Sequence, residues 1–282
     1  MKGLAVVLAA LFVLPMIGLA DEPTGLAPTH NERDEKCKGA FCFSGFYKHR
    51  YRHLTDFELE AKLPGEPADA HGVVGQGLQQ LRARIRYNSH KTVSLVAEVD
   101  LFSGNLYGDT SSLGSDFLLA PDERLDFTDP LAMAQLRQAY VHWQSPIGVF
   151  RLGQQASHFG LGILANGGSD EGHDVFDDPQ FGDLVERVVY VTKPLKPLMT
   201  GAFADSFLFI GGFDLVFRDD NANLIDGDIA MQGVFSLMYK TKPLTAGVYF
   251  AIREQEDSDG DTLSVQAYDA FLQFKHDFKT LN

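Results

Sequence analysis

Residues 81–101 read LRARIRYNSHKTVSLVAEVDL and contain two runs in which apolar and polar side chains alternate. The apolar positions are Leu81, Ala83, Ile85, Tyr87, Val93, Leu95, Ala97, Val99 and Leu101. A two-residue period predicts β-strands with one apolar and one polar face. The polar link between the runs predicts a hairpin, and a five-residue turn at 88–92 would set Arg82 opposite Glu98.

The same alternation recurs along the chain in segments of about ten residues, the length that a tilted transmembrane strand requires. It is clear at 207–217 and 229–239, where aromatic and aliphatic residues share one parity. Weaker segments lie at 43–57, 133–144, 149–154, 184–193, 244–253 and 263–276. The sequence therefore predicts an all-β fold of about ten strands.

The connections between these segments alternate in length. The short links are 88–91, 145–148, 193–197 and 240–243, and the long ones are 58–77, 103–132, 155–183, 218–228 and 254–262. Short turns on one side and long loops on the other are typical of an antiparallel up-and-down barrel in an outer membrane. A soluble β-sandwich also has regular turns, but it does not usually place every long connection on one side.

The N-terminus predicts secretion. A positive Met1-Lys2 precedes an apolar run from Leu4 to Leu14, and the small residues that end at Ala20 suit a cleavage site. The run is shorter than the roughly 20 apolar residues of a transmembrane anchor. We therefore expect a signal peptide at 1–20, a periplasmic segment at 21–42 and an outer-membrane barrel at 43–282.

Composition and cysteine usage agree with this compartment. The chain has 282 residues, a net charge of -14 and a pI near 5.0, which argues against nucleic-acid binding because phosphates would repel it. In an oxidising compartment Cys37 and Cys42 can form a disulfide just before the first strand. No later stretch has 18 consecutive apolar residues, so spanning helices are not expected after residue 20.

The acidity is concentrated in the five long loops, which hold about two thirds of the 38 acidic residues. An outward-facing acidic rim would need Ca²⁺ or Mg²⁺ at low affinity to relieve repulsion from anionic surface lipid. The alternative is a solvated acidic surface that keeps the protein soluble. Residues 219–223 and 257–261 space oxygen ligands two apart but lack the glycine and glutamate of an EF-hand, so no dedicated metal site or cofactor is expected.

The polar parity of the strands predicts the lining of a lumen, because a charged side chain facing lipid at the bilayer centre costs about 2–4 kcal/mol. The predicted lining residues are Lys48, Arg50, Arg52, Arg82, Arg84, Arg86, Glu98, Asp100, Arg151 and Asp214. On the first strand Tyr47, Tyr51 and Phe57 take the opposite, lipid-facing parity. A basic wall facing an acidic patch would filter solutes by charge. Alternatively, these charges pair off and plug a narrow barrel.

Enzymatic activity is not predicted. The sequence contains no Gly-x-Ser-x-Gly, His-Glu-x-x-His or Gly-rich phosphate loop. Ser157-His158 and His173-Asp174 lie in one long loop, which leaves an outer-membrane hydrolase as a minor alternative.

Two stretches resemble known families. Residues 137–141 followed by 148–154 resemble the strand–turn–strand of Gram-negative general porins. Residues 157–168, then Phe181-Gly182-Asp183 and Glu186-Arg187, are similar to an uncharacterised porin-like outer-membrane family of deltaproteobacterial type. That family carries Arg, Trp and Asp where this chain has Gln154, Phe159 and Glu186. The resemblance covers about half of the chain and implies an outer-membrane barrel but no substrate.

The glycines of the 155–183 loop, at 160, 162, 167 and 168, predict sharp turns that fold it back toward the lumen. The chain is therefore expected to form a porin-like channel for passive diffusion of small solutes, with outer-membrane lipid as its partner. A homo-oligomer is compatible with this interpretation. The competing hypothesis is a closed barrel that binds a surface partner or cations through its acidic loops. Ten strands without a terminal aromatic residue suggest the N-terminal part of a larger barrel.

Overall fold

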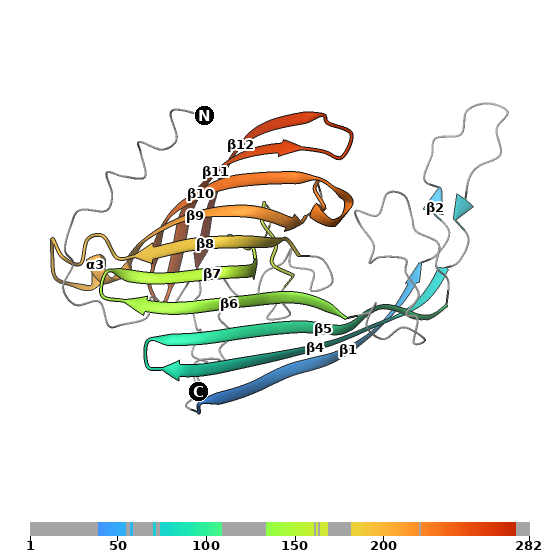
Figure 1. Cartoon of the computed structure of the whole chain (residues 1–282), viewed down its shortest axis with the longest axis horizontal. Helices are drawn as coiled ribbons and strands as arrows, with labels where there is room; N and C mark the ends of the chain where they lie inside the picture. The colour runs from blue at the N-terminus through green and yellow to red at the C-terminus, as the bar shows by residue number, and fades with distance from the viewer. Residues whose placement is uncertain are drawn as a thin grey trace, which may run out of the picture.

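The computed structural model describes residues 39–54, 57–58, 70–71, 74–108, 134–160, 162, 164–168, 182–219 and 221–274. Most of them form one antiparallel sheet of ten strands (Figure 1). These strands are β1 (Phe41–Leu54), β4 (Val74–His90), β5 (Val93–Gly108), β6 (Gln135–Ser145), β7 (Gly148–Ala156), β8 (Leu184–Thr192), β9 (Phe207–Arg218), β10 (Ile229–Lys240), β11 (Leu244–Glu256) and β12 (Thr262–Phe274). The prediction of an all-β fold with about ten antiparallel strands is confirmed.

The strands pair in chain order, so the sheet is an up-and-down meander. Strands β1 and β12 are its two edges, and the sheet does not close on itself within the described residues. Figure 1 shows that it is strongly curved, with the short links at one end and the described β9–β10 and β11–β12 links at the other. A separate pair, β2 (Phe57–Glu58) and β3 (Ala70–His71), lies in the β1–β4 connection. No helix in the described part of the chain is long and apolar enough to cross a membrane.

The first strand is displaced relative to its predicted bounds. It begins at Phe41 and ends at Leu54, so Cys42 lies inside β1 rather than before it. Phe57, predicted on the same apolar parity as Tyr47, belongs to β2 instead. Cys42 is disulfide-bonded, and Cys37, its expected partner, lies outside the described residues, as does the predicted signal peptide.

The register of β4 against β5 corrects the predicted hairpin. Strand β4 continues to His90 and β5 begins at Val93, which leaves a two-residue turn at Lys91 and Thr92. This tighter turn and a β-bulge between Asn88 and His90 together pair Arg82 with Asp100 and Arg84 with Glu98, not Arg82 with Glu98. The parity survives because a shift of two residues keeps each side chain on the same face.

The β8–β9 connection is also longer than the predicted 193–197 link. It runs over residues 193–206 and ends in the short helix α3 (Ala202–Ser206). The other three short links connect their strands directly.

The outer face of the sheet is apolar, whereas the inner face buries charged and polar side chains beside apolar ones such as Val189, Leu208 and Val216. The outer face exposes large apolar side chains on every strand. Examples are Tyr47 at 60%, Ile85 at 43%, Trp143 at 44%, Phe213 at 50% and Tyr268 at 72% exposure. The inner face buries polar and charged residues, including Arg82, Arg84, Glu98, Asp100, Gln138, His142, Arg151, Asp214 and Ser236.

Part of the β7–β8 connection, residues 157–168 with 161 and 163 not described, lies on this inner face. We call it the inner segment. Three of its four glycines adopt backbone angles that other residues rarely take, with φ of 60° at Gly160, 77° at Gly162 and 60° at Gly168. A Cβ at Gly160 would lie 2.9 Å from the ring of Phe271 in β12. The predicted inward fold of this loop is thus observed over the described residues.

Candidate functional site

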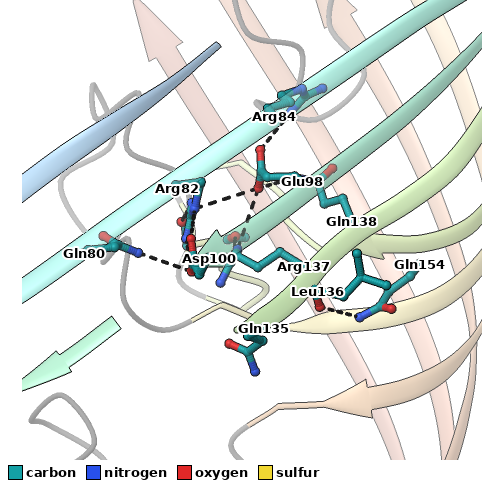
Figure 2. A network of polar contacts seen from close by, with 12 residues as sticks. Gln80, Arg82, Arg84, Glu98, Asp100, Gln135, Leu136, Arg137, Gln138 and Gln154 are labelled. Atoms are coloured by element: carbon teal, nitrogen blue, oxygen red, sulfur yellow. Dashed lines mark hydrogen bonds and ion pairs between the residues drawn. The ribbon is translucent and has the colours of Figure 1, made fainter. Parts of the chain in front are cut away.

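A cluster of five charged residues lies on the inner face of β4, β5 and β6 (Figure 2). We call Arg82, Arg84, Glu98, Asp100 and Arg137 the charged cluster. All five side chains are at most 8% exposed. Strand alternation places the first four on one face, and adjacent pairing of β4 with β5 brings the opposite charges together.

The contacts within the cluster are direct. Arg82 donates to both carboxylate oxygens of Asp100, from Nε at 2.6 Å and from Nη2 at 2.9 Å. Arg84 Nη1 donates to Glu98 Oε2 at 3.2 Å, and Gln138 Nε2 donates to Glu98 Oε1 at 3.0 Å. Arg137 Nε lies 3.7 Å from Glu98 Oε1. Removing one charged residue of the cluster should be strongly destabilising, because it leaves a buried charge of opposite sign without its partner.

Arg137 joins the cluster through a β-bulge. Glu98 pairs with Gln138 and Val99 pairs with Leu136, so Arg137 is an extra residue opposite this step. Simple alternation would place Arg137 on the outer face with Trp143. The bulge turns it inward, where its side chain is 1% exposed.

Two arginines of the cluster hold one end of the inner segment. Arg82 Nη1 donates to the carbonyl oxygen of Gly168 at 2.9 Å, and Arg137 Nη2 donates to that of Gly167 at 2.7 Å. Both carbonyls come from a chain segment between β7 and β8, whereas the arginines come from β4 and β6. The charged cluster therefore anchors the inner segment as well as pairing neighbouring strands.

The other end of the inner segment is held by apolar packing. The Phe159 ring stacks on Tyr249 of β11 at 4.8 Å and meets Phe271 of β12 edge-on at 5.1 Å. Leu208 and Met238 complete this buried group. The inner segment thus bridges the N-terminal and C-terminal parts of the curved sheet.

A second buried ion pair lies on β8 and β9. Arg187 Nε donates to Asp214 Oδ1 and Arg187 Nη2 donates to Asp214 Oδ2, both at 2.6 Å, and the Asp214 side chain is fully buried. Gln232 Nε2 of β10 donates to Asp214 Oδ2 at 2.8 Å. Arg187 Nη2 also donates to Ser157 Oγ at 2.9 Å. The pair therefore connects three strands to the start of the inner segment.

The other predicted lining residues whose side chains the structure describes lie on the same face. Lys48 and Arg50 are half-buried on β1, beside Gln80 and Leu78 of β4. Arg86 donates to Asn88 and Ser94 at 3.0 and 3.1 Å. Arg151 donates to His142 Nδ1 at 3.2 Å and lies 5.5 Å from the centre of the Tyr140 ring. The side chain of Arg52 is outside the described part of the chain.

Three residues of the site were not predicted as site residues. Arg187 has the inward parity of Val185 and Val189, so alternation in 184–193 could have identified it. Arg137 could not be found by parity, because a bulge reverses its direction. Phe159 lies in a loop, where neither the two-residue period of a strand nor the 3.6-residue period of a helix indicates which way a side chain points.

Two described acidic residues of the long loops, Asp219 and Asp257, accept hydrogen bonds in local turns. Asp219 Oδ1 accepts from the backbone N–H groups of Asn221 and Ala222, and its carboxylate pairs with Arg253. Asp257 Oδ1 accepts from the N–H groups of Asp259 and Asp261. Among the described residues, no group of three or more His, Cys, Asp or Glu is placed to hold a metal ion.

The Ser157-His158 pair of the hydrolase alternative is held by other partners. Ser157 Oγ accepts from Arg187, and the two ring nitrogens of His158 lie 3.2 Å from Gly160 O and 3.4 Å from Gly167 N. The pair His173-Asp174 lies outside the described residues.

The fold and site define an antiparallel meander with a charged, buried inner face, an apolar outer face and a chain segment across the inside. No family model matches the chain, and a comparison with curated proteins finds no match. The resemblance to porin-like families therefore remains a prediction.

Proposed function

We propose that this chain is part of an outer-membrane, porin-like β-barrel channel for passive diffusion of small polar or charged solutes. The observation that carries the proposal is an exposed apolar outer face around an interior that buries charged and polar side chains beside apolar ones. In water, exposed rings on strand after strand around a buried arginine–carboxylate core would be unfavourable. In a bilayer the same arrangement is favourable, because lipid solvates the apolar face and polar side chains line the inside.

A row of aromatic residues supports a membrane location. It follows the short-turn end of the outer face from β1 to β10. Its members are Phe41, Tyr87, Trp143, Phe150, Tyr190, Phe207 and Tyr239. Three pairs of neighbours have their ring centres in contact, at 4.6 Å for Phe41 and Tyr87, 5.4 Å for Trp143 and Phe150, and 4.8 Å for Phe150 and Tyr190. Such girdles mark the membrane interface of outer-membrane barrels.

The experiment that tests the proposal is planar-bilayer conductance of the purified, folded protein. We expect discrete, ion-selective current steps. A well-folded protein that inserts into lipid and gives no current would contradict the channel and favour the closed barrel.

Ion selectivity provides a sharper test of the lining. Lys48 and Arg50 are half-buried on the inner face of β1, outside the charged cluster. Reversing both charges (Lys48→Glu with Arg50→Glu) should shift the reversal potential in a salt gradient toward cation selectivity, because these groups would set the local field in the lumen. The matched control is Lys91→Glu, the same kind of charge reversal at an exposed turn. Equal shifts in both variants would show that β1 does not line the permeation path.

The closed barrel remains the second candidate, and a specific observation favours it. The charges of the cluster are paired and buried, and the inner segment lies over them. A barrel filled in this way would be silent in bilayers, and its acidic loops would then engage cations or a surface partner.

A further inference from the structure

The β8–β9 connection carries a group of exposed apolar side chains at the short-turn end of the sheet. Leu198 is 77% exposed, Met199 48% and Phe203 56%. We call these three residues, together with Lys193, Lys196, Lys240 and Lys242, the turn patch. The three apolar side chains belong neither to the charged cluster nor to the Arg187–Asp214 pair.

The backbone under the patch is ordered by hydrogen bonds. The N–H groups of Leu198 and Met199 both donate to Leu195 O at 3.0 Å, and Asp205 N donates to Gly201 O at 3.2 Å. Ala204 is buried and seats α3 against the end of the sheet. The apolar side chains are therefore presented by a folded turn.

The patch continues the apolar outer face. The Phe203 ring centre lies 5.6 Å from that of Tyr239 on β10 and 6.4 Å from that of Phe207 on β9. Both partners belong to the aromatic row at the short-turn end. Phe203 thus extends this row beyond the ends of the strands.

Four lysines lie in the two connections at this end of the sheet. Lys193 and Lys196 lie in the same connection, and Lys240 and Lys242 lie at the neighbouring β10–β11 link. Asp205 opposes them, at 3.8 Å from Lys196 Nζ. The turn patch is locally basic in a chain whose net charge is -14.

We propose that the turn patch lies in the headgroup layer of a phospholipid leaflet, with Leu198, Met199 and Phe203 at the acyl boundary and the lysines against anionic lipid phosphates. Apolar side chains beside lysines are the signature of an interfacial segment. Anionic headgroups attract nearby lysines, and the attraction weakens with salt. The proposal rests on the membrane location proposed above and adds a lipid-recognition site to it.

Trp fluorescence can test the location and the site separately. The chain has one tryptophan, Trp143, on the outer face of β6. The wild-type protein and a Trp143→Phe, Phe203→Trp variant are reconstituted in phosphatidylcholine vesicles brominated near the headgroup end or deeper in the acyl chain. We expect quenching of Trp143 in the wild type, and strongest quenching of the variant by the shallow bromines. Quenching of Trp143 without quenching of the variant overturns the turn patch alone, whereas no quenching of either overturns the membrane location.

The lysines are tested by lipid charge. We expect phosphatidylglycerol in the vesicles to raise the folding equilibrium constant of the wild type by up to about five-fold for each lysine in contact with headgroups. Changing Lys193, Lys196, Lys240 and Lys242 to Gln should remove most of this gain, and Lys91→Gln should remove little. An undiminished gain in the fourfold variant would overturn the lysine contacts. A second copy of the chain could instead cover the patch. A dimer in detergent, seen by sedimentation, together with a Phe203→Trp variant that bromines do not quench in vesicles, would overturn the lipid contact in favour of that second copy.

Discussion

Phe159→Ala should release the inner segment from β11 and β12 and lower the free energy of unfolding by about 3–5 kcal/mol. The Phe159 ring is buried between Tyr249 and Phe271, and the inner segment has no other described ring contact on that side of the sheet. In bilayers we expect a larger and noisier conductance, because the segment loses its contact with β11 and β12 and stays tethered at Ser157, Gly167 and Gly168. Urea unfolding in detergent micelles and single-channel recording measure the two effects.

Phe159→Leu is the matched control. It keeps most of the apolar volume and should retain conductance close to the wild type, with a smaller loss of stability. If Phe159→Ala matches the wild type in both measurements, the inner segment is not held by this packing.

Asp214→Ala should lower the free energy of unfolding by about 3–5 kcal/mol, because it leaves Arg187 buried without its carboxylate. Gln232 and Ser157 would lose the pair that they contact, so the loss should extend across β8, β9 and β10. Equilibrium unfolding in urea, followed by intrinsic fluorescence, measures the change.

The double variant Arg187→Leu with Asp214→Leu distinguishes two causes of the destabilisation. One is the cost of burying Arg187 without a carboxylate, and the other is the loss of the attraction between the two charges. Removing both charges together should restore much of the stability, since apolar replacement of a buried pair is often neutral. A loss below about 1 kcal/mol for Asp214→Ala would instead indicate a pair solvated like a surface ion pair. That result would place water against this part of the inner face.

Much of the fold could be predicted from residue patterns. Alternation in 81–101 identified the strands and assigned Arg82, Arg84, Glu98 and Asp100 to one face, and the lengths of the connections indicated the meander. The turn between β4 and β5 was predicted three residues too long, because polar residues near a turn pair as readily as they form a loop. The side chains keep their faces because the bulge between Asn88 and His90 takes up one residue, so the register shifts by two residues and not by three.

The charged cluster was only partly predictable. Its four alternating members follow from sequence, but the Arg137 side chain points inward only because a bulge opposite Glu98 and Val99 adds one residue to β6. Phe159 reaches β11 and β12 because the sheet curves and the glycines at 160 and 162 turn the loop. Both contacts join segments far apart in the chain, which a local period does not encode.

The sequence by itself therefore determined the strands, the face that each alternating residue takes and the alternation of short and long connections, since each follows from a period of two or from the spacing of turns. Only the tertiary structure decided which charges pair, that Arg82 and Arg137 anchor Gly168 and Gly167, and that Phe159 packs across the inside. These depend on register, on a bulge and on the curvature of the sheet, which arise when all the strands pack together.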